Sequence, residues 1–222
     1  MRVMAIDSSS VCTGVVIAEI IEDKLVKVGS TPVIPQKFDV SSLGFFKTKR
    51  RYKNKEGKEY LAYTKDGETY VTEALAKRRN VQVRHEANNF KMKNIGAQLD
   101  MIIKNIQPNI IVIERNKTFN SVLTSSLLAE VMGLVEGVAS ANNIPLYKFT
   151  VEEVRKSINT ARLVKLFAMQ RTPEELSSCK DVTKEAIQDY MMVEYAKYGF
   201  KPATLDESDA CLIFHYWYNN IF

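Results

Sequence analysis

The chain has 222 residues, of which 45% are hydrophobic and 26% charged, and its net charge at pH 7 is +5. These values are typical of a globular protein, and we expect a single domain over residues 1–222. No apolar run reaches the roughly 18 residues of a membrane span, which excludes an integral membrane protein of the helical class. The N-terminus lacks the apolar core and cleavage site of a signal peptide, so we expect a cytoplasmic protein with no membrane partner.

The positive charge is concentrated in one segment. Residues 45–84 contain twelve Lys or Arg and five Asp or Glu, a net charge of +7, so the rest of the chain carries −2. This asymmetry favours a polyanion as the partner and residues 45–84 as its contact, although a solvated surface loop is the plainer alternative.

Short apolar runs predict the first part of the fold. Residues 3–6 form a buried strand, and residues 15–18 and 25–28 would continue it as an antiparallel meander. The basic segment 45–84 follows, with turn sequences at residues 55–58 and 65–68 beside aromatic and β-branched residues. This pattern predicts an inserted basic β-hairpin, or β-ribbon.

The second half of the chain alternates helices and strands. Apolar residues at helical spacing predict a helix over residues 85–105, which ends before Pro108, and residues 109–113 predict a strand buried in a parallel sheet. The other predicted elements are helices over residues 122–141, 184–198 and 204–217, a strand over residues 144–149, a short helix opened by a capping box at Thr150, and a helix start at Thr172. This order predicts an α/β fold with a mixed central β-sheet flanked by helices.

Four carboxylates fall at the ends of these apolar elements: Asp7, Glu114, Asp206 and Asp209. A carboxylate beside a core is costly unless it is paired, and a divalent cation is the simplest partner for several acids from distant parts of a chain. Asp206 and Asp209 are three residues apart and share one face of a helix.

Each acid also has a plainer interpretation. Asp7 could form an Asx turn, and Glu114 could be a polar strand end. Asp206 and Asp209 could complement a helix dipole, but Thr204 and Glu207 already have capping-box spacing. The set is therefore more informative than any single member.

Together the four acids indicate a phosphodiester hydrolase. If the strands at residues 3–6 and 109–113 are neighbours, Asp7 and Glu114 lie side by side, and the start of the last helix can add the two aspartates. Four carboxylates can hold two Mg²⁺ about 4 Å apart, a pair that activates water and stabilises the leaving oxygen. The only histidines, His85 and His215, do not suggest a catalytic triad.

These residues carry a resemblance to a known family. In order and spacing the chain resembles the RuvC-type Holliday junction resolvases of the ribonuclease-H-like (retroviral integrase) superfamily. The matching stretches are Ile6-Asp7-Ser8-Ser9-Ser10 with Thr13-Gly14, Ile111-Val112-Ile113-Glu114, and Asp206-Glu207-Ser208-Asp209-Ala210. The resemblance covers about residues 1–40 and 86–222, with an insertion near residues 159–180.

The resemblance implies a ribonuclease-H-like fold and a homodimer that cuts symmetric strands of four-way DNA junctions in recombination and repair. It also implies two Mg²⁺ per active site, with Mn²⁺ as a substitute. Asp7, Glu114, Asp206 and Asp209 match the catalytic acids, and Lys184 lies near a family lysine that contacts the scissile phosphate region. The expected DNA contacts are Lys47, Lys49, Arg50, Arg51, Lys53, Lys77, Arg78, Arg79, Arg115, Lys117, Phe119 and Lys156.

The chain departs from the family at three places. Ser8-Ser9 stands where the family has Pro-Gly after the first aspartate. The family's junction-opening aromatic has its nearest counterpart in Phe119, which is out of register in an ungapped alignment. Cellular members lack a basic insertion such as residues 45–84, and in this respect the chain resembles bacteriophage versions, which act in the host cytoplasm.

Three other functions stay open. An actin-like ATPase or sugar kinase shares this fold, and residues 7–14 could form a phosphate loop, but no second phosphate motif or adenosine motif follows. A non-catalytic module that binds branched DNA would use the basic segment but has no need of the four acids. An integrase or transposase shares the acidic site but normally has extra domains for recognising DNA ends.

Overall fold

The structure, a computed structural model, describes residues 1–8, 13–34, 46, 48–53, 55–64, 70–115, 122–158 and 183–222. The chain divides into two compact units, one made of Met1–Pro35 with Ile95–Phe222 and the other of Gln36–Asn94. The second of the two boundaries, between Asn94 and Ile95, falls within helix α1 (Glu73–Ile106). No helix in the described ranges is long and apolar enough to cross a membrane.

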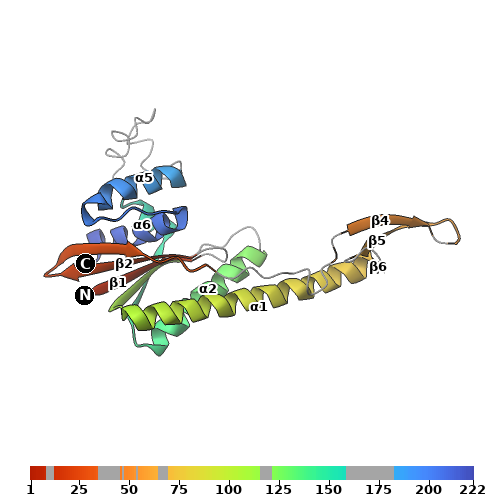
Figure 1. The fold of residues 1–222 in the computed structure, drawn as a ribbon, viewed down its shortest axis with the longest axis horizontal. Coiled ribbons are helices and arrows are strands. Elements are labelled where there is room, and N and C mark those ends of the chain that lie inside the picture. The colour runs from red at the N-terminus through yellow and green to blue at the C-terminus, as the bar shows by residue number, and fades with distance from the viewer. Residues whose placement is uncertain are drawn as a thin grey trace. The chain divides into compact units, whose positions relative to one another are not determined.

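The larger unit is built on a mixed sheet (Figure 1). Within the described residues this sheet has five strands in the order β3-β2-β1-β7-β8, of which β3, β2 and β1 are antiparallel and β1, β7 and β8 are parallel. The strands are β1 (Arg2–Asp7), β2 (Gly14–Ile21), β3 (Lys24–Ser30), β7 (Ile110–Arg115) and β8 (Leu146–Thr150). The predicted α/β class with a mixed sheet is confirmed.

Helices cover both faces of this sheet, and this explains the continuous apolar character of its central strands. Figure 1 shows α5 (Lys184–Tyr195) and α6 (Leu205–Asn220) on one side, and α2 (Val122–Ala141) with the part of α1 from Ile95 on the other. Because β1 and β7 are enclosed from both sides, residues 3–6 and 111–113 have no exposed surface.

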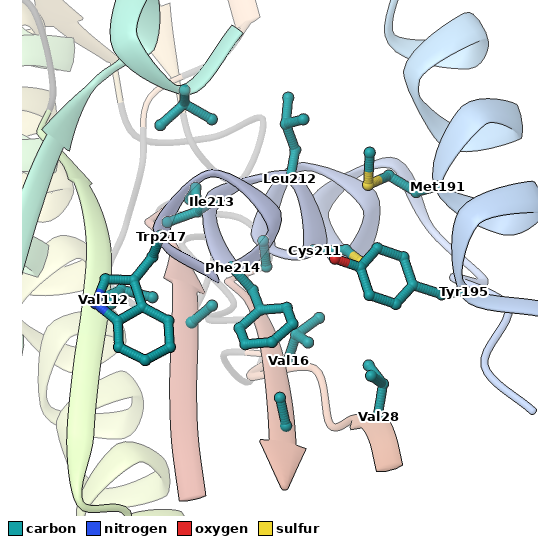
Figure 2. Close-up of a cluster of buried hydrophobic side chains, with 14 of the residues drawn as sticks. Val16, Val28, Val112, Met191, Tyr195, Cys211, Leu212, Ile213, Phe214 and Trp217 are labelled. Atoms are coloured by element: carbon teal, nitrogen blue, oxygen red, sulfur yellow. The ribbon is translucent and has the colours of Figure 1, made fainter. Parts of the chain in front are cut away.

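The core on the α6 side joins that helix to the strands and to α5. Phe214 and Trp217 of α6 point toward the sheet, where Val16 and Val112 lie, and Tyr195 of α5 lies near α6 (Figure 2). Phe214 is completely buried and Trp217 is 2% exposed. This packing holds the whole length of α6 against the centre of the sheet, so the position of its first turn is set by the core.

The smaller unit has its own antiparallel sheet. In the described residues its strands run in the order β4-β5-β6, with β4 (Thr48–Lys53), β5 (Glu59–Thr64) and β6 (Tyr70–Thr72). The β4–β5 connection includes Gly57 at φ 81°, and the predicted basic hairpin is thereby confirmed. The turn predicted at residues 65–68 lies outside the described residues, as does the predicted helix start at Thr172.

The predicted start of the helix at residue 85 is wrong, because α1 begins at Glu73. The buried positions of its first half are Ala76, Val83 and Ala87, which keep helical spacing but are too small to give a strong apolar signal. Asn80 also faces inward, since its side chain exchanges two hydrogen bonds with the backbone of Phe46, at 2.8 and 2.9 Å. The other predicted elements in the described ranges agree with the structure to within three residues.

Candidate active site

Two of the four carboxylates lie at the ends of neighbouring parallel strands. β1 pairs with β7 so that Ile6 lies opposite Ile113, and the next residue of each strand is an acid, Asp7 and Glu114. Both side chains are half-buried. Carboxyl ends of adjacent parallel strands meet at one edge of a sheet, so strand pairing alone brings these two acids together.

The other two carboxylates belong to the start of α6. Its N-cap is Thr204, whose hydroxyl accepts a hydrogen bond from the Glu207 amide at 3.1 Å, while the Glu207 carboxylate accepts one from the Thr204 amide at 3.2 Å. This capping box fixes the start of the helix, with Asp206 in its first turn and Asp209 one turn further on. Near a helix N-terminus, negative charge is favoured by the helix dipole.

Lys184 joins the two C-terminal helices at the carboxylate cluster. It is the first residue of α5, whose N-cap Thr183 accepts a hydrogen bond from the Ala186 amide. Its Nζ donates to Asp209 Oδ2 at 2.5 Å, with the lysine side chain 50% and the aspartate 16% exposed. Partial burial lowers the pKa of Lys184, but the hydrogen bond and charge of Asp209, with smaller contributions from Asp7 and Asp206, raise it overall.

The pKa values show that the four acids form one electrostatic cluster. The pKa of Asp7 is raised well above its usual value, first by burial and then by the charges of Asp209, Glu114 and Asp206, while Lys184 opposes the shift. The pKa of Glu114 is raised to about 7, first by burial and then by Asp209. Repulsion between carboxylates in a poorly hydrated site is relieved when an acid is protonated or when a cation binds.

The donor chemistry of the cluster fits a hard divalent cation, because all four side chains offer carboxylate oxygens. In the described parts of the chain, however, no three His, Cys, Asp or Glu side chains are arranged so that they could hold a metal ion as they stand. From the sequence we expected the four acids to hold two Mg²⁺ between them. In the structure the four acids repel one another, and the ammonium group of Lys184 donates a hydrogen bond to Asp209.

The other predicted site residues belong to both units of the chain. Arg115 and Lys156 are exposed, at the ends of β7 and of α3 (Val151–Arg155). In the smaller unit, Arg51, Arg78 and Arg79 are exposed, while Lys53 and Lys77 are paired with acids (Glu59 at 3.4 Å and Glu73 at 2.8 Å). Lys49 and Arg50 belong to β4, and Lys47, Lys117 and Phe119 lie outside the described residues.

Sequence reasoning missed Arg155 as a site residue. Its charge lowers the pKa of Glu114, against the larger effects of burial and Asp209. The signal was available in part, because α3 follows β8 directly and β8 pairs with β7 so that Phe149 lies opposite Glu114. The first helix after β8 therefore had to begin beside the end of β7.

Comparisons with known proteins give matches at the level of structure. No family model matches the sequence, and no curated protein matches it. A structure of T. thermophilus RuvC in complex with a Holliday junction substrate matches with a TM-score of 0.53 and 14% identity, over 97% of this chain and 92% of that chain. A second T. thermophilus RuvC structure matches with a TM-score of 0.52 and 12% identity over the same shares. The chain therefore has the ribonuclease-H-like fold of RuvC, as its sequence motifs predicted.

Proposed function

We propose that this protein is a metal-dependent endonuclease that cleaves four-way DNA junctions. The observation that carries the proposal is the convergence of four carboxylates from β1, β7 and α6 on one edge of a RuvC-type sheet. Such mutual repulsion at a poorly hydrated place destabilises the protein, and is expected where a cation is needed for function. The fold of RuvC, whose structure holds a junction substrate, supports branched DNA as the substrate here.

Within this proposal Asp7, Glu114, Asp206 and Asp209 would hold two Mg²⁺, with Mn²⁺ as a substitute. The bound ions would supply the Lewis acidity that makes water nucleophilic and stabilises the leaving oxygen. Lys184 is half-exposed beside the acids, so its ammonium group can offset negative charge on the scissile phosphate. Asp7 and Glu114 stand on paired strands, and this limits the reorganisation that catalysis requires.

The proposed partners are a branched DNA and a second copy of the chain. A four-way junction presents two equivalent strands, and a homodimer would present one active site to each of them. The α2 helix is a candidate dimer face, because a Cβ at Gly133 or Gly137 would meet no atom within 4 Å. We place the activity in DNA recombination, repair or phage DNA processing, in the cytoplasm.

The test is cleavage of a labelled four-way junction against a linear duplex of matched sequence, in Mg²⁺ or in EDTA. We expect paired nicks across the junction in Mg²⁺, and none in EDTA. Equal cleavage of forks and flaps would broaden the activity to branched DNA in general. Tight binding without cleavage in Mg²⁺ and Mn²⁺ would instead favour the non-catalytic module.

The basic unit is expected to supply sequence-independent affinity. Arg51 and Arg78 are exposed, and Arg51→Ala with Arg78→Ala should weaken junction binding at 0.15 M salt and lower the slope of log K against log salt by about 2. Both residues belong to the smaller unit and the four acids to the larger one, so the substitutions leave the acids unchanged and cleavage at saturating protein should not change. Fluorescence anisotropy over a range of salt concentrations measures both quantities.

The matched control is the pair Lys24→Ala and Lys27→Ala, two exposed basic residues of β3. It removes the same charge from the larger unit. If this control changes the salt slope as much as the Arg51 and Arg78 pair, the basic unit has no special role in binding DNA.

A further inference from the structure

Gly14 lies in close contact with the first turn of α6. A Cβ built on Gly14 would overlap the backbone carbonyl of Asp206 and would stand 2.9 Å from the amide nitrogen of Glu207. These are backbone atoms of a capped helix, so they cannot turn aside as the end of a flexible side chain could. Any residue larger than glycine at position 14 therefore requires the start of α6 to move.

The need for glycine here is one of space. The glycines with positive φ in the described ranges are Gly57 and Gly199, and Gly14 is an ordinary strand residue of β2. By comparison, Gly29 of the adjacent strand β3 would accept a Cβ with no atom within 4 Å. Contact with α6 thus distinguishes Gly14 from another glycine of the same sheet.

The position of Gly14 in the sheet connects this contact to the carboxylates. Gly14 is the direct partner of Asp7 in the β1–β2 register. The helix turn that rests on Gly14 carries Asp206, and Asp209 follows in the next turn. The depth at which α6 sits on β2 therefore sets how closely the two helix acids approach Asp7.

A second contact holds the same turn from the side. Glu207 is 4% exposed, and its Oε1 accepts a hydrogen bond from the Ser30 hydroxyl of β3 at 2.9 Å. Its Oε2 accepts from the amides of Ala203 and Thr204, at 2.7 and 3.2 Å. Glu207 therefore caps its own helix and ties that helix to the strand beyond β2 in the sheet.

We propose that Gly14 is a positioning residue for the metal site, and that the Ser30–Glu207 hydrogen bond assists it. The missing side chain lets α6 rest on β2 at the depth at which Asp206 and Asp209 reach Asp7 and Glu114. This inference rests on the proposed function, since it assigns a role within the same site. It adds two residues, Gly14 and Ser30, that bear no catalytic group.

The main test compares Gly14→Ala with Gly29→Ala, which adds the same methyl group to the neighbouring strand. For Gly14→Ala we expect kcat on the junction to fall about 100-fold, because displacements of about 1 Å have this cost. Mn²⁺ affinity, measured by titration calorimetry without DNA, should fall at least about 10-fold. The Kd for the junction should not change, and Gly29→Ala should match the wild type in all three quantities.

Hydrogen exchange on the metal-free proteins separates this inference from the proposed function. Gly14→Ala should exchange faster at the amides of residues 206–209, and Gly29→Ala should not. If this difference appears but the wild type neither binds Mn²⁺ nor cleaves DNA, the structural role of Gly14 stands and the proposed function fails. If Gly14→Ala has the same amide exchange, Mn²⁺ affinity and kcat as the wild type, the inference is overturned.

Ser30→Ala covers the case in which Gly14→Ala does not fold. It removes one hydroxyl from a strand at the edge of the sheet, so the protein should stay folded. We expect a loss in Mn²⁺ affinity and kcat of about 3-fold to 10-fold, with an unchanged Kd for the junction, because removing one hydrogen bond costs about 1 kcal/mol. Wild-type values of both quantities in Ser30→Ala would contradict the assisting role, and would overturn the inference if Gly14→Ala is unfolded.

Discussion

Asp7→Asn is expected to abolish cleavage of four-way junctions while the protein stays folded and binds DNA. The charges of the other three acids all act on Asp7. Burial raises the pKa of its carboxyl first, and the charges of Asp209, Glu114 and Asp206 raise it further. An amide keeps the shape of the side chain but loses the charge that attracts a cation. We expect the cleavage rate to fall by at least about 10³-fold, as for other groups on which a whole site depends.

The same substitution should not weaken junction binding, and it should raise the stability of the metal-free protein. Removal of one negative charge reduces the repulsion of phosphate and of the neighbouring carboxylates. Single-turnover cleavage, anisotropy with EDTA and urea denaturation measure the three effects. Asp189→Asn, at an exposed position of α5, is the matched control and should behave as the wild type in all of them. Persistent Mg²⁺-dependent cleavage by Asp7→Asn would place the chemistry elsewhere.

The stability of the metal-free protein is expected to fall as the pH rises from about 4.5 to about 7. The pKa of Glu114 is raised from 4.5 to about 7, so over this range the folded protein binds more protons than the unfolded chain. Stability decreases with pH wherever the folded state binds more protons. The shift corresponds to a loss of about 3 kcal/mol, which is complete above pH 7, and the raised pKa of Asp7 acts in the same direction.

Urea denaturation in EDTA at pH 5 and pH 8 measures this loss. Glu114→Gln has no carboxyl proton to lose, so the part of the pH dependence of stability that is due to Glu114 should disappear. The control is Glu86→Gln, at an exposed position of α1, which should keep the pH dependence of the wild type. Mg²⁺ should restore stability at pH 8 more than at pH 5, because a cation binds the ionised carboxylates. If the wild type is equally stable at both pH values, the pKa of Glu114 is not raised in the folded protein.

The sequence by itself identified the elements that place the acids. The runs before Asp7 and Glu114 are apolar without alternation, which is typical of strands buried on both faces, and β1 and β7 have this environment. The capping box of Thr204 and Glu207 marked the start of α6 correctly, because a cap depends on residues only three apart. Such patterns depend only on residues that are close together in the sequence, so they can be recognised before the fold is known.

Local patterns were insufficient where the buried residues are small or the partners distant. The first half of α1 buries Ala76, Val83 and Ala87, so its apolar face was too weak to recognise. Arg155 was missed because its effect on Glu114 depends on the pairing of β8 with β7.

The tertiary structure alone decided how the acids meet. The choice of four acids followed from their places at the ends of apolar elements, but their spacing depends on strand register, on the depth of α6 over Gly14 and on the contact of Lys184 with Asp209. Strand register joins residues of different strands. The contact of Lys184 with Asp209 joins residues that are 25 positions apart in the sequence. Their energies arise from burial, close packing and repulsion between charges, and these forces act only after the chain has folded.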